Sequence, residues 1–353
     1  MSKRTNKKDR GPIIDAETMA VMDNLIRQAG GDPDTMTGSV AREMMHTAIK
    51  LLRDKADEGE MKLISRSLKE LRYALKVFRP YEEVRKISVF GSARTEETHP
   101  DYVACVDFSR QMAEAGWMVI TGAGGGIMAA GHGGAGAQKS FGVAIRLPFE
   151  QATNEFIADD PKLVTFRYFF TRKLMFMWQS HAVALFPGGF GTQDEGFEAL
   201  TLIQTGKAPV LPIVMVEQPG GDYWKHWDHY VRKELLAGGL ISEEDLHLYH
   251  VTDSTADAAR VILDFYRNYH SQRYVNDVIV LRLNRPLRAK QLEELNRDFS
   301  SLVLEGKIEQ GGPLPQEREH LHLPRLHFPF GKKHFGTLRQ LINRVNEMDA
   351  ANA

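Results

Sequence analysis

The sequence has a single cysteine, Cys105, among 353 residues. One cysteine excludes an intramolecular disulfide and any metal site built from several thiolates. Cys105 falls within the amphipathic pattern of residues 102–115. This placement indicates a buried structural thiol rather than a nucleophile.

Long apolar runs and an excess of charge are also missing. No run approaches the ~18–20 apolar residues that a membrane-spanning helix needs. Lys and Arg number 45 and Asp and Glu 46, for a formal net charge of -1, so neither nucleic acid nor an anionic membrane is indicated as the main partner. The basic stretch Met1–Arg10 is followed by no apolar segment, which argues against a secretory signal. We therefore expect a cytoplasmic protein whose residues 1–12 form a disordered basic tail; a weak nucleic-acid arm is the alternative for this tail.

The common nucleotide fingerprints are incomplete. Gly122-Ala-Gly-Gly-Gly126 follows an apolar run, but the G-x-G-x-x-G pattern fails because Ile127 stands at its last glycine. Arg146 closes the next apolar run where a dinucleotide site would carry an acidic residue. No G-x-x-x-x-G-K-[ST] segment occurs. A dinucleotide site and a P-loop are thus disfavoured, and the glycine run is either a structural turn or part of a ligand loop.

What the sequence does contain is a regular alternation of short apolar runs and amphipathic segments. Residues 13–80 show helical periodicity and predict a helical extension. Residues 81–270 alternate strand and helix patterns, which predicts an α/β domain with a doubly wound, Rossmann-like parallel sheet. Residues 271–353 predict a small C-terminal α+β appendage, with residues 306–323 as loop.

One segment combines a strand, a glycine loop and a helix start. It runs His181-Ala-Val-Ala-Leu-Phe-Pro-Gly-Gly-Phe-Gly-Thr-Gln-Asp-Glu195, and we expect the helix to begin at Thr192. Loops of this kind lie at the carboxyl edge of a parallel sheet, where the helix start attracts an anion such as phosphate. Thr192 and Glu195 also fit a T-x-x-E capping box. From spacing alone the capping role and the phosphate-binding role stay equally open.

Other candidates have competing explanations. Arg172 and Lys173 open a predicted helix, where a cation is unfavourable, so Arg172 is expected to serve an anion or carboxylate; a solvated surface pair is the alternative. The connection Leu147–Asn154 could line a pocket or be a surface loop. His132 is a weak pocket candidate, and the four histidines of the appendage show no metal-ligand spacing. Those four are His320, His322, His327 and His334.

At these residues the sequence resembles the LOG (Lonely Guy) family, long labelled as possible lysine decarboxylases. Pro187–Glu195 matches its PGGxGTxxE signature. Further matches lie at Phe90–Arg94, Leu147–Gln151 with Asn154, Arg172-Lys173, and Gln204–Lys207. The resemblance covers about residues 86–269, and the flanking segments look like those of longer bacterial members.

The resemblance implies a phosphoribohydrolase that needs no metal or redox cofactor. Such enzymes cleave the N-glycosidic bond of nucleoside 5′-monophosphates, such as AMP or cytokinin riboside 5′-monophosphates, to free base and ribose 5-phosphate. The family's catalytic pair falls on Arg172 and Glu195, and members form at least homodimers. The expected phosphate- and substrate-binding residues are Gly188, Gly189, Gly191, Thr192, Gly91, Ser92, Gly124, Gly125, Lys173 and Asn154.

Two residues depart from the family pattern at the first glycine loop. Ala123 stands in place of a glycine, and Ala129 replaces an acidic residue that faces the ligand site in the family. Ala129 motivates an alternative function, a nucleotide-binding or sensor protein without useful catalysis. Lysine decarboxylation is a poor third explanation, because no lysine near the glycine loops is singled out for a pyridoxal cofactor.

Overall fold

A computed structural model describes residues 15–147 and 152–350, and of residues 349 and 350 the backbone alone. The chain divides into two compact units, Met1–Lys69 and Glu70–Ala353. The predicted basic tail and Glu150 and Gln151 of the predicted pocket loop lie outside the described residues.

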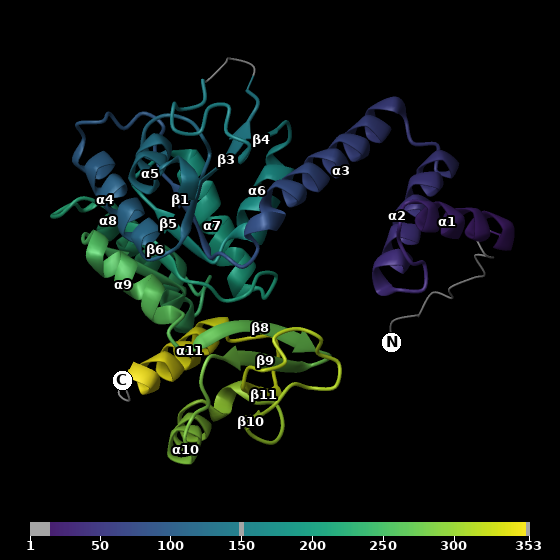
Figure 1. Ribbon diagram of the computed structural model, residues 1–353. Coiled ribbons are helices and arrows are strands. Elements are labelled where there is room, and N and C mark those ends of the chain that lie inside the picture. Colours follow the sequence, from purple (N-terminus) through teal and green to yellow (C-terminus); the bar gives the residue numbers. More distant parts are fainter. Residues whose placement is uncertain (1–14, 148–151, 351–353) are drawn as a thin grey trace. The chain divides into compact units, whose positions relative to one another are not determined.

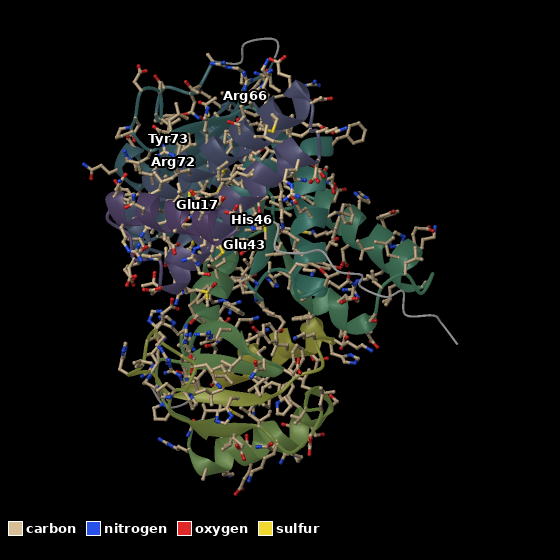
Figure 2. The ribbon with its side chains drawn as sticks, turned by 90° about the vertical axis from the view of Figure 1, so that its right-hand side faces the viewer. Glu17, Glu43, His46, Arg66, Arg72 and Tyr73 are labelled. Atoms are coloured by element: carbon tan, nitrogen blue, oxygen red, sulfur yellow. The ribbon has the colours of Figure 1, made fainter. Side chains whose placement is uncertain are left out.

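The first unit is helical, as the periodicity predicts. It contains α1 (Ala16–Gln28), α2 (Met36–Arg53) and the beginning of α3 (Glu58–Phe78). Figure 2 shows Glu17 on α1 and Glu43 and His46 on α2. The second helix begins at Met36, where the Thr35 side chain accepts a hydrogen bond from Gly38 N and caps it.

Two methionines of α2 are exposed. Met44 is 52% exposed and Met36 81% exposed. Helical spacing identifies a face but not what covers it.

The second unit is built on seven parallel strands in the order β4-β3-β2-β1-β5-β6-β7 (Figure 1). The predicted doubly wound α/β fold is confirmed. The chain order reverses between β1 and β5, which pair directly. Open parallel sheets bind ligands at the carboxyl edge of such a switch point. The strands are β1 (Lys86–Phe90), β2 (Met118–Thr121), β3 (Ser140–Ile145), β4 (Leu163–Phe166), β5 (Ala182–Leu185), β6 (Ile213–Val216) and β7 (Tyr249–Thr252).

Helices cover both faces of this sheet. On one face α4, α5 and α9 pack through an apolar cluster that contains the buried Cys105. On the other face lie α6, α7 and the end of α3, whose Phe78 stacks on Phe141 at 4.2 Å between ring centroids. The helices are α4 (Pro100–Glu114), α5 (Ile127–Ala135), α6 (Phe169–Gln179), α7 (Phe190–Gln204), α8 (Tyr223–Tyr230) and α9 (Thr255–Phe265), with short turns η1 (Arg79–Tyr81), η2 (Ala137–Lys139), η3 (Val231–Leu236) and η4 (Glu243–Leu248).

A four-stranded antiparallel sheet, in the order β10-β11-β9-β8, follows the parallel sheet. Its elements are β8 (Tyr269–Val275), β9 (Val278–Leu283), α10 (Ala289–Asp298), η5 (Ser300–Leu302), β10 (Glu309–Gly311), β11 (Arg325–Pro329) and α11 (Phe335–Ala350). Its apolar side chains belong to the same cluster as those beneath α6 and α7. In the connection between β10 and β11, the buried Glu317 accepts hydrogen bonds from Arg282 and Arg325.

Candidate functional site

Three loops meet where β1, β2 and β5 end. Ser92, in the loop after β1, ties them together: its N–H donates to Pro187 O at 3.1 Å, and its carbonyl accepts from Ile127 N at 3.0 Å. Pro187 precedes the glycine loop after β5, and Ile127 follows the glycine loop after β2. Both glycine loops therefore lie at the switch point of the sheet, at the edge the sequence predicts.

Glycine stands in these loops for two different physical reasons. A Cβ at Gly126, which has a φ of +60°, or at Gly188 would collide with neighbouring protein atoms, so packing demands glycine there. A Cβ on Gly189 or Gly191 would meet nothing within 4 Å. Neither position has a positive φ. No protein contact explains these two glycines, and their open side gives a ligand room to approach the backbone.

Beside these loops is a cleft of about 880 Å³. It is lined by eight of the predicted site residues, namely Gly91, Ser92, Arg172, Gly188, Gly189, Gly191, Thr192 and Glu195. The four other predicted residues, Gly124, Gly125, Lys173 and Asn154, are not among the lining residues of this cleft. The predicted catalytic pair thus shares one cavity with the second glycine loop, although 23 positions separate the two residues in the sequence.

The helix after the second glycine loop starts earlier than predicted. It begins at Phe190, with Gly189 as N-cap and no side chain capping it. Thr192 is therefore inside the first turn, with its side chain buried beside Gly188. The T-x-x-E capping box proposed from spacing is wrong, because Thr192 does not occupy the cap position. The first helical hydrogen bond runs from Gln193 N to Gly189 O, so the N–H groups of residues 190–192 have no intrahelical acceptor.

Arg172 reaches the cleft from the first turn of α6. Its Nε donates to Val143 O at 2.9 Å, and its guanidinium lies against Gly122. Its side chain is directed into the protein, so the solvated surface pair with Lys173 is excluded. Burial lowers the pKa of Arg172, and the nearby Glu195 carboxylate opposes that shift.

Burial raises the pKa of Glu195 to about 7, although Lys173 and Arg172 pull it down. The two cations favour the ionised form, but the removal of the carboxyl from water outweighs them. A carboxyl that titrates near neutrality is suited to accept or donate a proton.

Lys173 stands behind the cleft and joins α6 to α7. Its Nζ lies 2.8 Å from Asp194 Oδ2 and 2.9 Å from Glu198 Oε2. These residues flank Glu195 on α7, so Lys173 fixes the turn that carries Glu195. It is a positioning residue by this geometry.

Asn154 supports the first glycine loop from behind. Its Nδ2 donates to Gly124 O at 2.9 Å, and its side chain also contacts the Nδ1 atom of His132. His132 is buried, its other ring nitrogen lies 3.0 Å from Thr121 Oγ1, and burial lowers its pKa. His132 belongs to this structural network rather than to the cleft. Ala129 does not line the cleft either, whereas its neighbour Met128 does.

Several lining residues were missed by the sequence analysis. The clearest is Tyr223, whose hydroxyl donates to Gly188 O at 2.5 Å and accepts from Gln193 Nε2 at 2.7 Å. It begins the helix that follows β6, the strand beside β5. That place, just past the carboxyl end of the adjacent strand, was the signal that could have revealed it. The other lining residues not predicted are Phe90, Ala93, Arg94, Gly122, Met128, Phe169, Phe190, Gln193 and Asp194.

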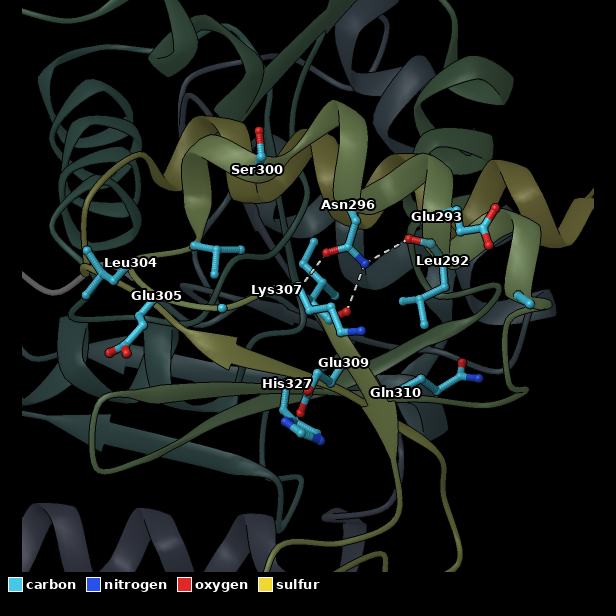
Figure 3. Close-up of a pocket in the computed structure, with 14 residues that line it drawn as sticks. Leu292, Glu293, Asn296, Ser300, Leu304, Glu305, Lys307, Glu309, Gln310 and His327 are labelled. Atoms are coloured by element: carbon cyan, nitrogen blue, oxygen red, sulfur yellow. Dashed lines mark hydrogen bonds between the residues drawn. The ribbon is translucent and has the colours of Figure 1, made fainter.

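A second cleft, of about 910 Å³, lies between α10 and the edge of the small sheet (Figure 3). Asn296 faces it, but its amide bonds to both backbone groups of Ile308 and so fastens the neighbouring loop. Three carboxylates, on Glu293, Glu305 and Glu309, surround the single Lys307. This acidic lining is unsuited to a phosphate.

The described residues form neither a metal-binding cluster nor a membrane-spanning helix. No cluster of three or more His, Cys, Asp or Glu side chains within them could hold a metal ion. Among the same residues, no helix is long and apolar enough to cross a membrane.

The fold and the cleft define a doubly wound α/β protein with a candidate ligand site at the switch point of its sheet. Residues 126–262 match the sequence profile of the family described as "Possible lysine decarboxylase". Over this segment the predicted resemblance to the LOG family is confirmed.

Among solved structures, one similar protein is the molybdenum cofactor carrier protein from Chlamydomonas reinhardtii. It is 21% identical, covers 51% of this chain and 96% of its own, and gives a TM-score of 0.36. The protein TM1055 is 19% identical over 51% of this chain and 99% of its own, with a TM-score of 0.37. DNA processing protein A from Helicobacter pylori is 13% identical; the match covers 52% of this chain and 82% of that protein, with a TM-score of 0.35. No protein with a curated description matches the sequence.

Proposed function

We propose that the protein is a nucleoside 5′-monophosphate phosphoribohydrolase. It hydrolyses the N-glycosidic bond of AMP or a cytokinin riboside 5′-monophosphate to free base and ribose 5-phosphate. The observation that carries this proposal is the meeting of Arg172 and Glu195 in one cleft, beside the open glycines at the start of α7. Membership of the LOG-type family supports it.

In this proposal the 5′-phosphate binds at the start of α7. The N–H groups of residues 190–192 lack intrahelical acceptors, and the helix dipole favours an anion there. Gly189 and Gly191 leave the phosphate space to approach, and the hydroxyl of Thr192 adds a donor. Phosphate binding then contributes remote binding energy that positions the ribose.

Glu195 acts as the general base for the attack of water on the glycosidic carbon, C1′. Its carboxylate takes a proton from a water molecule, whose oxygen attacks C1′ as positive charge develops on the ribose. The C1′–N bond breaks, its electron pair goes to the base, and a proton from solvent completes the free base. Arg172 limits the rise in the pKa of Glu195, so that enough carboxylate is present near neutral pH.

The predicted residues that do not line the cleft act through the ones that do. Lys173 holds the first turns of α7, and Asn154 fixes the carbonyl of Gly124. Gly125 packs beside the loop after β1, where a Cβ would lie 3.4 Å from Ala93 O. These residues set the positions of Glu195 and of the first glycine loop.

The proposal is tested by incubating the protein with AMP, GMP, CMP, UMP and a cytokinin riboside monophosphate. Free base is followed by chromatography, with an active LOG-family enzyme as the positive control. We expect base release from at least one nucleotide. Release from none of the five contradicts the proposal.

A nucleotide-binding or sensor protein is the second candidate. It is favoured by Ala129, which stands where the family has an acidic residue. Calorimetry that detects nucleotide binding while the chromatographic assay detects no base favours this candidate.

We also propose that the protein forms a homodimer or a higher homo-oligomer. Phe169, Phe170, Leu174 and Trp178 of α6 are 49–71% exposed, and Phe169 also lines the cleft. Four large apolar side chains on one helix favour contact with another protein surface. Light scattering after gel filtration should give at least twice the monomer mass, and Trp178→Glu should lower it; a monomeric wild type contradicts the proposal.

A further inference from the structure

Arg339, on α11, is a buried cation whose guanidinium is incompletely hydrogen-bonded within the described part of the chain. Its exposed fraction is 6%, and neither Nε nor Nη1 has a partner among the described residues. Its guanidinium carbon lies 4.2 Å from the ring centroid of Phe265 on α9. A cation–π contact does not replace the hydrogen bonds that a buried guanidinium loses when it leaves water.

The other buried arginines of this unit have a carboxylate partner. Arg282 and Arg325 both bond to the carboxylate of Glu317. Burial lowers the pKa of Arg339 to about 10, and Tyr266 and Tyr269 oppose that shift. Among the described residues, Arg339 thus lacks a carboxylate partner of the kind that Arg282 and Arg325 share.

Arg339 lines a cleft of about 500 Å³ between η4, β7, α9 and α11. The lining contains three arginines and two histidines against two carboxylates, Asp264 and Glu347. Both carboxylates are already paired, Asp264 with Arg260 and Arg267 and Glu347 with Arg344. Arg260 and Arg267 of the lining thus have carboxylate partners, so Arg339 is the lining arginine that remains for an anion, at a site that is separate from the glycine loops.

Nearby amides show which groups are available for binding. The Asn346 amide is held by the protein, because it accepts from Asn268 N and Tyr269 N and donates to Phe265 O. Asn343 lies one helical turn after Arg339 and lines the same cleft. Since residues four apart share a helix face, Asn343 and Arg339 can contact one ligand.

We propose that Arg339 and Asn343 bind the phosphate group of a small molecule in this cleft. Phosphate suits the site because a guanidinium presents fixed donors to its oxygens and because the anion balances the charge of Arg339. The cleft volume is within the range of small-molecule sites, so the phosphate can belong to an ester such as a sugar phosphate. This proposal does not rest on the enzymatic one.

The test is hydrogen–deuterium exchange of the full chain, without ligand and with inorganic phosphate or ribose 5-phosphate. Peptides covering residues 255–268 and 335–348 report on this cleft, and peptides covering 188–204 report separately on the glycine-loop site. We expect slower exchange at 255–268 and 335–348 with at least one probe. Inorganic phosphate alone would identify a site for the free ion, and ribose 5-phosphate alone a site for an ester. No slowing with either probe overturns the proposal, whatever happens at 188–204.

Two variants and one control make the test specific. Arg339→Met keeps the apolar stem and removes the charge, and Asn343→Leu keeps the charge and removes the amide. Each should weaken the phosphate-dependent protection about tenfold, as expected for a charge-assisted hydrogen bond. Arg344→Met, on the same helix but paired with Glu294 and Glu347, should leave it unchanged. Protection of wild-type strength in Asn343→Leu and in any folded Arg339→Met protein overturns the proposal.

Discussion

Gly122 makes room for the guanidinium of Arg172. A side chain at position 122 would occupy the space of Arg172 Nη2 and of the Met128 sulfur. The first glycine loop therefore shapes the site, because the absence of a side chain at Gly122 leaves the space through which Arg172 enters the cleft.

The first prediction concerns this contact. Gly122→Ala should displace Arg172 and lower base release from AMP by about tenfold or more, because small misplacements of a catalytic group are costly. The matched control is Gly312→Ala, where a Cβ meets nothing within 4 Å and lies outside the cleft. Equal activity of the two variants would show that the position of Arg172 does not matter.

The second prediction separates the two roles of Thr192. Since Gly189 rather than Thr192 caps α7, Thr192→Val should change the free energy of unfolding by less than the ~1 kcal/mol typical of a lost cap. It should still weaken AMP binding, measured by calorimetry, whereas Thr192→Ser should retain it. A loss of stability with unchanged AMP binding would show that the role of Thr192 is purely structural.

Glu195 should make stability depend on pH. Below about pH 4.5, the ordinary pKa of the group, its carboxyl is protonated in both the folded and unfolded states. As the pH rises toward about 7, the unfolded state loses this proton first, so the folded state loses stability. Glu195→Gln removes this penalty.

Thermal unfolding checks this third prediction. Glu195→Gln should raise the melting temperature at pH 8 relative to the wild type and should have little effect near pH 4. The control is Glu114→Gln, an exposed residue paired with Arg110. No difference between pH 4 and pH 8 would contradict the raised pKa.

Lys173 should tune the pH dependence of the reaction. Its charge lowers the pKa of Glu195, so Lys173→Met should raise that pKa and move the rise of base release to higher pH. Lys173→Arg keeps the charge and should leave the pH–rate profile nearly unchanged. If the Met variant loses activity equally at every pH, Lys173 acts only by holding α7.

Much of the fold could be predicted because apolar runs and amphipathic segments alternate so regularly in the second unit. β8 was missed because Tyr269–Val275 contains polar residues and is mostly half-buried, so it has no clean two-residue period. β10 was missed because it has only three residues inside a Gly- and Pro-rich stretch. The start of α7 was misplaced because a glycine backbone caps it and gives no side-chain signal.

The site could be predicted where a motif spans consecutive residues, as in Pro187–Glu195. Tyr223 was missed because no motif joins it to Gly188; its place past the end of β6, the strand beside β5, is the one signal of this contact. The raised pKa of Glu195 could not be predicted either, since the burial of its carboxyl depends on how α6 and α7 pack. Arg339 escaped notice for the same reason: its burial beneath α9 is a tertiary property.

The central claim is that Glu195 performs the chemistry while the start of α7 binds the phosphate. Its most direct test compares Glu195→Gln with the wild type, measuring base release from AMP together with AMP binding by calorimetry. The account predicts that the variant retains binding and loses nearly all base release. Base release at the wild-type rate in Glu195→Gln would contradict it.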